Sequence, residues 1–172
     1  MKFFNESKRR TFISANKEYC TIEKHVNAPF VKKIFNCKTG KLAELEISAV
    51  GFYRLWLNGQ EMTKGFFAPY ISNPDQVIYY DVYDVKDLLR EEDNVIVALL
   101  GNGFGNELDS NLWEFEKAEF RAAPKVYISL KVDGKEVLTT DESFMAFDSA
   151  ITFDGLRTGE RYDARLERED IL

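Results

Sequence analysis

A polar loop that follows a predicted strand supplies the side chains best suited to bind a ligand. Within ten residues, five of its side chains carry amide or carboxylate oxygens: Asn102, Asn106, Glu107, Asp109 and Asn111. Ca²⁺ prefers such oxygens, so Asn106, Glu107 and Asp109 are candidate metal ligands. Trp113 follows, and an indole face can stack on the apolar face of a sugar ring. Asn102, Asn106, Glu107 and Trp113 therefore form a candidate carbohydrate site; the alternative is a polar surface loop whose Trp113 packs on a neighbouring domain.

The same loop begins with alternating glycines in the sequence GNGFGN, at residues 101–106. A dinucleotide-binding fingerprint would need a helix directly after these glycines, within a strand-helix-strand unit. The residues that follow, ELDSNLWEF, have no apolar helical face, which argues against nucleotide binding. We expect instead a tight loop at the edge of a sandwich, because glycine permits backbone conformations that other residues avoid.

A second candidate surface lies on the predicted strand at residues 52–58. Alternation of side chains places Tyr53, Leu55 and Leu57 on one face, which belongs in a core. The opposite face carries Arg54, Trp56 and Asn58. This face could form a sugar platform, with Asn58 as a candidate carbohydrate-binding residue, but Asn58 also begins a tight-turn sequence. The structural role is favoured over sugar binding.

Two carboxylates near the C-terminus, Glu160 and Asp163 in the sequence GERYDAR, are candidates for hydrolytic chemistry. Glycoside hydrolysis needs one carboxyl group as acid and another as base or nucleophile, about 5–10 Å apart. A spacing of three along an extended chain places these two on opposite faces, and Arg161 and Arg165 would lower their pKa values. The sequence therefore assigns no catalytic residue. We expect these four side chains to pair with each other and with a neighbouring domain.

Side chains for zinc binding or nucleophilic catalysis are scarce. The chain has one histidine, His25, and two cysteines, Cys20 and Cys37, without CxxC spacing. A zinc site or a Ser-His-Asp triad is therefore hard to assemble, and His25 is interpreted as a half-exposed strand residue. Buried free thiols are favoured for the cysteines, and a disulfide between them is left open. The sequence predicts no required cofactor and leaves Ca²⁺ as a candidate ion.

Composition limits the possible partners. Hydrophobic residues make up 45% of the 172 residues, which favours one packed domain. The formal net charge of −6, with 23 basic residues scattered among 29 acidic ones, argues against a nucleic-acid partner. No stretch approaches the roughly 20 apolar residues of a membrane span, and the start, MKFFNESKRR, lacks the apolar core of a signal peptide. We therefore expect a cytoplasmic protein with no membrane partner.

Alternation of apolar and polar residues dominates the chain, and this is the period of a half-buried strand. Eight segments show it: residues 19–26, 30–37, 42–50, 52–58, 77–85, 95–101, 125–132 and 135–140. Asn58-Gly59 and Asp133-Gly134 predict tight hairpin turns. Residues 84–94 predict one short helix, with Asp84 as its cap and Asn94 at the start of the next strand.

These elements predict an all-β fold, an antiparallel two-sheet β-sandwich with one short helix. The sandwich is expected to be jelly-roll-like and to resemble carbohydrate-binding modules. Residues 1–18 are interpreted as an N-terminal lead-in and residues 19–153 as the β-sandwich domain. Residues 154–172 are interpreted as a charged connector toward a further domain.

Four stretches, taken in order, resemble the N-terminal β-domain of bacterial α-L-rhamnosidases. They are AELEISAVGFYRLWLNGQEM, APYISNPDQVIYYDVYDVKDLLREEDNVIVALLGNGFGN, WEFEKAEFRAAPKVYISLKV and TFDGLRTGERYDARLE. The resemblance covers roughly residues 30–167. One departure is Phe104-Gly105, where many members carry a Trp-Tyr pair, so a ligand role ascribed to that pair does not transfer directly.

The resemblance implies a parent enzyme that hydrolyses terminal α-L-rhamnosyl bonds with inversion, using acidic residues of an α/α barrel outside this sequence. This chain would then be a non-catalytic module that supports the barrel and assists recognition of rhamnosyl groups. Its implied partners are rhamnose-containing glycosides and the other domains of the enzyme. Some related β-domains bind rhamnose through calcium. The alternatives are a free-standing, Ca²⁺-dependent carbohydrate-binding module and a self-sufficient hydrolase, which the missing nucleophile-base arrangement argues against.

Overall fold

Two antiparallel sheets pack face to face in this protein, in a computed structural model that describes residues 2–3, 10–15, 25–73, 76–107, 119 and 121–172. Strands of the first sheet lie in the order β1-β7-β4-β9-β10, and β2 also pairs with β9. Their bounds are Lys2–Phe3 (β1), Ile13–Ser14 (β2), Ala43–Val50 (β4), Tyr79–Asp84 (β7), Lys125–Val132 (β9) and Lys135–Thr139 (β10).

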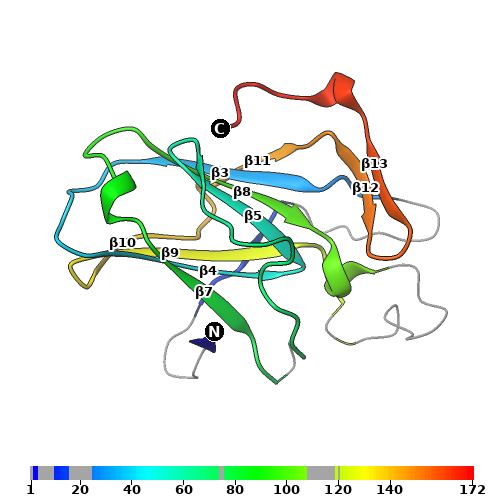
Figure 1. Ribbon diagram of the computed structural model, residues 1–172, viewed down its shortest axis with the longest axis horizontal. Helices are drawn as coiled ribbons and strands as arrows, with labels where there is room; N and C mark the ends of the chain where they lie inside the picture. The colour runs from blue at the N-terminus through cyan, green and yellow to red at the C-terminus, as the bar shows by residue number, and fades with distance from the viewer. Residues whose placement is uncertain (1, 4–9, 16–24, 74–75, 108–118, 120) are drawn as a thin grey trace.

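The second sheet has the strand order β11-β3-β8-β5-β6. Its strands are Pro29–Phe35 (β3), Phe52–Leu57 (β5), Gln60–Glu61 (β6), Asn94–Gly101 (β8) and Met145–Asp148 (β11). A separate hairpin pairs β12 (Ile151–Gly155) with β13 (Gly159–Tyr162). Figure 1 shows β3, β5 and β8 in one layer, β4, β7 and β9 in the other, and the hairpin beyond one end of the sheets. The predicted all-β, two-sheet sandwich is confirmed.

The core lies between the sheets because alternation turns every second side chain of each strand inward. In β4, Leu45 and Ile47 are fully buried while Glu44 is exposed. From the facing sheet, Ile96 and Leu100 of β8 enter the same core. Each such side chain contributes about 1.5–3 kcal/mol by leaving water. The core therefore fixes the end of β8, from which the candidate loop continues.

Both predicted hairpin turns are present. Asn58 and Gly59 have φ angles of 53° and 81° between β5 and β6. Asp133 and Gly134 have φ angles of 48° and 79° between β9 and β10. Positive φ at both central residues is the property of a type I′ turn, whose twist matches that of the flanking strands. These dipeptides therefore set the register of the two hairpins.

The predicted short helix is only a single 3₁₀ turn, η1 (Lys86–Leu88). Asp84 does not cap it as an N-cap residue, although its Oδ1 accepts a hydrogen bond from the Lys86 backbone N–H at 3.1 Å. The next strand starts at Asn94, as predicted.

The predicted strand at residues 19–26 lies largely outside the described residues, and its last residues, from His25 on, are not in a strand. The described part of the chain has no helix with the length and apolar character needed to cross a membrane.

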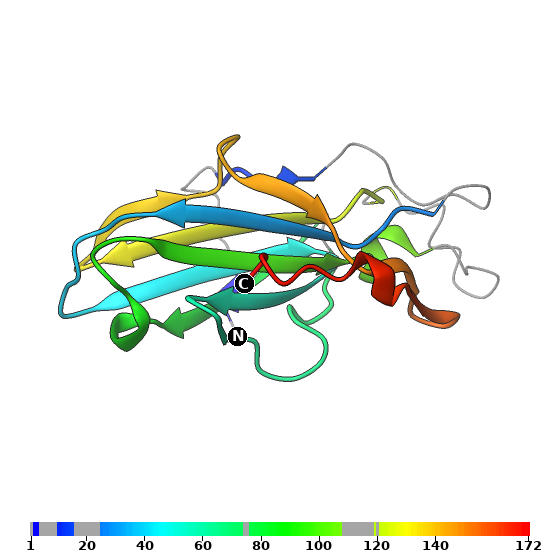
Figure 2. The same cartoon turned by 90° about the horizontal axis from the view of Figure 1, so that it is seen from above.

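The C-terminal segment folds back over the outer face of the second sheet, as Figures 1 and 2 show. Ile171 is buried there in a small apolar cluster with Trp56 and Val97. Lys32 of β3 holds the same segment, because its Nζ donates a hydrogen bond to the Asp170 carbonyl at 2.7 Å. The outer face of this sheet is therefore partly covered by the chain itself.

Replacing Ile171 with alanine should lower the free energy of unfolding by about 1–2 kcal/mol. Truncation of a buried aliphatic side chain costs about 2–5 kcal/mol in a rigid core, but a segment near a chain end can detach locally, which limits the loss. Urea denaturation followed by fluorescence measures the change. The neighbouring Leu172→Ala variant is the control, because Leu172 is exposed, and an equal loss in both variants would contradict the packing role of Ile171.

Candidate functional site

The glycine-rich loop after β8 is held by a buried polar network. It forms the 3₁₀ turn η2 (Gly103–Asn106). The Asn102 backbone N–H donates to Asp154 Oδ2 at 2.7 Å, and Asn102 Nδ2 donates to Asp154 Oδ1 at 2.7 Å. Asn106 Nδ2 in turn donates to Asn102 Oδ1 at 2.6 Å. The network therefore ties the loop to β12, which carries Asp154.

Glu107 makes a second connection to the hairpin. Its Oε2 accepts a hydrogen bond from the Leu156 backbone N–H at 2.9 Å. Asn102, Asn106 and Glu107 are 2–3% exposed. The structure thus brings together three of the residues that the sequence named as candidate ligands. Their described partners belong to each other and to the β12-β13 hairpin.

Burial is the main influence on Asp154. It raises the pKa of this carboxyl above its ordinary value, although the hydrogen bonds from Asn102 act in the opposite direction. The nearby carboxylates Glu160 and Glu107 also raise the pKa. A raised pKa accompanies some catalytic acids. Here both carboxylate oxygens already accept hydrogen bonds from Asn102, as expected of a group that joins two segments.

Glycines bring the loop close to the β4-β5 turn. Gly51 has a φ of 105°, and a Cβ at this position would lie 2.2 Å from the Gly101 carbonyl oxygen. Gly103 has a φ of 51°, and its Cβ would lie 3.1 Å from the Gly51 Cα. The predicted tight loop at a sandwich edge is therefore observed, and its glycines are needed for close backbone approach as well as for conformation.

Asn58 lies away from this network. It sits at the β5-β6 turn beside the start of β8, whereas the network lies at the end of β8. An eight-residue strand separates them by about 23 Å at the usual rise per residue. Asn58 Nδ2 donates to the Leu88 carbonyl at 2.7 Å, and its Oδ1 accepts from the Val95 N–H at 2.8 Å. These bonds stabilise the turn, which agrees with the favoured structural role.

The remaining predicted ligands, Asp109, Asn111 and Trp113, lie outside the described residues. Within the described ranges, no group of three or more His, Cys, Asp and Glu side chains could hold a metal ion. Binding of Ca²⁺ or of a sugar by this loop stays a prediction.

Cys20 is also outside the described residues, while Cys37 is a buried free cysteine, and burial raises the pKa of its thiol.

On the Arg54-Trp56 face of β5, Trp56 is covered while Arg54 is exposed. Trp56 is only 8% exposed because it packs with Ile171. The Arg54 guanidinium lies 5.1 Å from the centre of the Trp56 ring and pairs with Glu61 through two hydrogen bonds of 2.8 and 2.9 Å. On the opposite face, Tyr53 is in the core as predicted. The tryptophan is therefore a packing residue in this structure.

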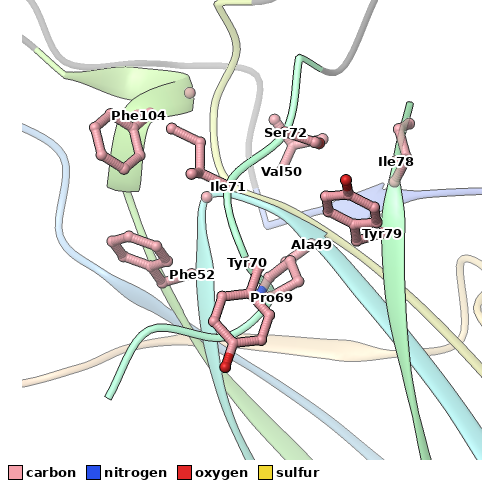
Figure 3. A pocket seen from close by; sticks show the side chains of 12 residues that line it. Ala49, Val50, Phe52, Pro69, Tyr70, Ile71, Ser72, Ile78, Tyr79 and Phe104 are labelled. Carbon is pink, nitrogen blue, oxygen red and sulfur yellow. The ribbon is translucent and has the colours of Figure 1, made fainter. Parts of the chain in front are cut away.

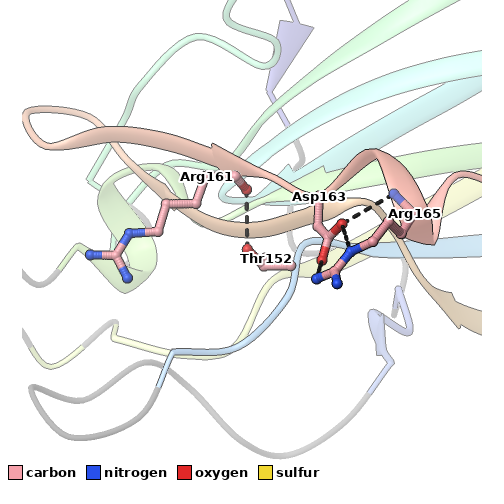
Figure 4. Close-up of polar contacts among 4 residues, drawn as sticks. All are labelled: Thr152, Arg161, Asp163 and Arg165. Atoms are coloured by element: carbon pink, nitrogen blue, oxygen red, sulfur yellow. Dashed lines mark hydrogen bonds and ion pairs between the residues drawn. The ribbon is translucent and has the colours of Figure 1, made fainter.

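The charged C-terminal sequence contains a hairpin strand followed by a turn (Figure 4). Asp163 accepts hydrogen bonds from the Arg165 side chain at 2.8 and 2.6 Å. These bonds lower the pKa of Asp163, with the Arg165 side chain as the largest cause. Arg161 lies with its guanidinium 5.4 Å from the centre of the Phe153 ring. The expected pairing within this sequence is thus seen for Asp163 with Arg165, and a low pKa is unsuited to a general acid.

An aromatic surface next to the polar network was not foreseen. Its most exposed large side chains lie in the loop between β6 and β7: Phe66, Phe67, Tyr70 and Ile71. Figure 3 shows Tyr70 and Ile71 of this loop grouped with Phe52 and Phe104 around a small cavity. The sequence GFFAPYIS carries a signal that could have revealed it, because aromatic residues stand between Gly65 and Pro69 where a loop would normally be polar.

A wider, mainly apolar pocket of about 500 Å³ adjoins this cavity. Its described lining comes from the 67–71 loop, the start of β5, η2 and the tip of the β12-β13 hairpin: Phe52, Phe67, Tyr70, Ile71, Phe104, Glu107, Leu156 and Arg157. Glu107 and Leu156 are the same residues that the polar network joins. The network therefore positions one wall of the pocket.

Known proteins resemble this chain in both sequence and fold. The family model described as the α-L-rhamnosidase N-terminal domain matches residues 38–171. An α-L-rhamnosidase of Formosa agariphila is 32% identical over 136 residues, which are 74% of this chain and 14% of that protein. An α-L-rhamnosidase of Streptomyces avermitilis is 29% identical over 129 residues, or 73% of this chain and 12% of that protein.

Solved structures of α-L-rhamnosidases superpose on this chain as well. The Streptomyces avermitilis α-L-rhamnosidase, solved with L-rhamnose, superposes with a TM-score of 0.73 and 26% identity over 83% of this chain and 14% of that one. The Aspergillus terreus enzyme has the same fold, with a TM-score of 0.78 and 24% identity over 94% of this chain and 19% of that one. The chain thus spans about one seventh of the first curated relative. Because the family model covers most of its residues, the chain belongs to the α-L-rhamnosidase N-terminal domain family.

Proposed function

We propose that this chain is a non-catalytic module of a larger α-L-rhamnosidase, which supports the catalytic part and assists recognition of terminal α-L-rhamnosyl groups. The match over residues 38–171 carries the proposal. The relatives that it matches are α-L-rhamnosidases several times longer than the matched region. The Streptomyces avermitilis relative was solved with L-rhamnose, which supports L-rhamnose as the sugar to test.

The placement of the carboxylates supports a role without hydrolysis by the module itself. Asp163 is paired with Arg165, and Glu107 and Asp154 are engaged by backbone N–H groups. A glycosidase needs one carboxyl group to hold a proton and another to act as base or nucleophile, both facing the substrate. Glu107 and Asp154 are instead used to hold segments of the chain together, and Asp163 is engaged within its own turn.

Titration of the chain with L-rhamnose by isothermal calorimetry tests the recognition part of this proposal. We expect saturable binding with a dissociation constant of about 1 mM, which is weak but measurable. D-rhamnose, the mirror image, is the matched control sugar. Equal heats for both enantiomers, or no saturable heat, would contradict recognition and leave structural support alone.

The same titration tests the proposed dependence on Ca²⁺. If Asn106, Glu107 and Asp109, the ligands predicted from the sequence, hold the ion, removal of Ca²⁺ with a chelator should weaken binding of L-rhamnose. Asp109→Ala should mimic the chelator, and Trp113→Ala should weaken sugar binding in the presence of Ca²⁺ because it removes a stacking ring. Affinity that is unchanged by the chelator and by both substitutions would rule out this loop as the sugar site.

A further inference from the structure

We propose that the apolar pocket between the 67–71 loop, η2 and the tip of the β12-β13 hairpin binds a flat, uncharged aromatic ring. Its volume of about 500 Å³ lies within the range of about 300–1,000 Å³ typical of small-molecule sites. Its lining includes four aromatic rings, those of Phe52, Phe67, Tyr70 and Phe104. Pockets for apolar ligands are lined mainly by such groups, with a few polar side chains.

The arrangement of the rings favours another ring as occupant. The Phe52 and Phe67 ring centres are 5.1 Å apart at an interplanar angle of 51°, and those of Phe52 and Phe104 are 6.2 Å apart at 77°. These are tilted and edge-to-face pairs, the geometries that aromatic rings prefer. Phe67 is 63% exposed, so part of its surface is available for a further contact of the same kind.

Charge in the lining favours a neutral ligand. Glu107 and Arg157 are the charged residues of the described lining, and their formal charges cancel. Glu107 is buried and its Oε2 binds the Leu156 N–H. A carboxylate or ammonium group on the ligand would lose hydration without a matching excess of opposite charge. An uncharged ring avoids this cost.

Hydrogen bonds hold the segments that form two walls of the pocket in the ligand-free protein. The Tyr53 N–H donates to the Ala68 carbonyl at 2.7 Å, which ties the 67–71 loop to β5. The Asn102-Asp154 bonds tie η2 to the hairpin. A site that is already ordered loses less conformational entropy on binding. The buried polar network thus has two roles: it ties the loop after β8 to the hairpin, and it shapes the pocket beside it.

The test uses 2-naphthol, an uncharged two-ring probe, added to the isotope-labelled chain and followed by amide chemical shifts. We expect saturable shifts near the pocket, among them those of Gly51, Leu156 and Arg157, with a dissociation constant of about 1 mM or tighter. The saturated analogue decahydro-2-naphthol, which is not flat, should bind at least about fivefold more weakly. Because neither probe is a sugar, the result is independent of rhamnose recognition.

Neighbouring phenylalanines provide matched variants. Phe67→Ala should weaken 2-naphthol binding about fivefold or more, because Phe67 lines the pocket. Phe66→Ala should change it less than about twofold, because Phe66 is 95% exposed and does not line this pocket. Both side chains are exposed, so neither substitution threatens the fold. Equal effects of the two variants, absent saturable shifts, or dimerisation of the chain through Phe67 would overturn the proposal.

Discussion

Replacing Gly51 with alanine should lower the free energy of unfolding by about 2–6 kcal/mol. The φ of 105° at this position is strained for any residue with a Cβ, which costs about 1–3 kcal/mol. The added Cβ would also lie 2.2 Å from the Gly101 carbonyl oxygen and 3.1 Å from that of Asn102. These atoms belong to the backbone, which cannot rotate away from the added Cβ. Overpacking of this kind costs a further contribution of about 1–3 kcal/mol.

The matched control is Gly59→Ala. Gly59 also has a positive φ, of 81°, but a Cβ there would meet nothing within 4 Å. The Gly59→Ala variant should lose only the cost of placing a residue with a Cβ at positive φ, which is about 1–2 kcal/mol of unfolding free energy. Denaturant midpoints of the two variants, measured at one pH, separate the effects. Similar losses in both would show that the close approach of the β4-β5 turn to the η2 loop does not matter for stability.

Asp154→Ala should have the second largest effect, a loss of about 2–4 kcal/mol. The substitution removes the two carboxylate oxygens that accept hydrogen bonds from the Asn102 backbone N–H and side-chain amide, and Asn102 is 3% exposed. Each unsatisfied buried donor costs about 1–3 kcal/mol. Asp148→Ala, at an exposed position of β11, is the control and should change stability by less than about 0.5 kcal/mol. Equal losses would contradict the joining role of Asp154.

The effect of Asp154 should depend on pH. Because its pKa is raised in the folded state, the folded protein holds this proton more tightly than the unfolded chain, whose carboxyl titrates near pH 3.9. The contribution of Asp154 to the free energy of unfolding is therefore largest below about pH 3.9, and it declines as the pH rises through the raised pKa of the folded state. The difference in unfolding free energy between the wild type and Asp154→Ala should shrink as pH increases from about 4. A difference that grows over this range would contradict the raised pKa.

Periodicity and turn chemistry predicted most strands of the sandwich. In β4 and β8 one face is buried in the core, so alternation of residue types follows alternation of environment. The last hairpin gave no such signal. All four residues of β13 are exposed, so its sequence carries charge instead of alternation, and it pairs with β12 through the backbone. Edge strand β11 is likewise mainly exposed.

The candidate loop was located from sequence, but the arrangement of its side chains was not. Asn102 and Asp154 are 52 residues apart, and Glu107 and Leu156 are 49 residues apart. Oxygen-rich side chains near one another suggest a ligand site, yet the same groups serve equally well to bind a distant segment of the chain. Only the fold distinguishes these uses. For the same reason the aromatic pocket, built from four separated segments, could not be read from any one stretch.

Hydrolysis of p-nitrophenyl α-L-rhamnopyranoside by the purified chain tests the central proposal, a non-catalytic rhamnosidase module, most directly. We expect release of p-nitrophenol at the rate of the buffer blank, while a full-length α-L-rhamnosidase in the same assay gives turnover. Asp154→Ala and Glu160→Ala variants extend the assay to the buried carboxyl of the network and to a carboxylate whose charge acts on it. Release that rises in proportion to the concentration of the chain, and that either substitution abolishes, would contradict the proposal and place catalysis within this domain.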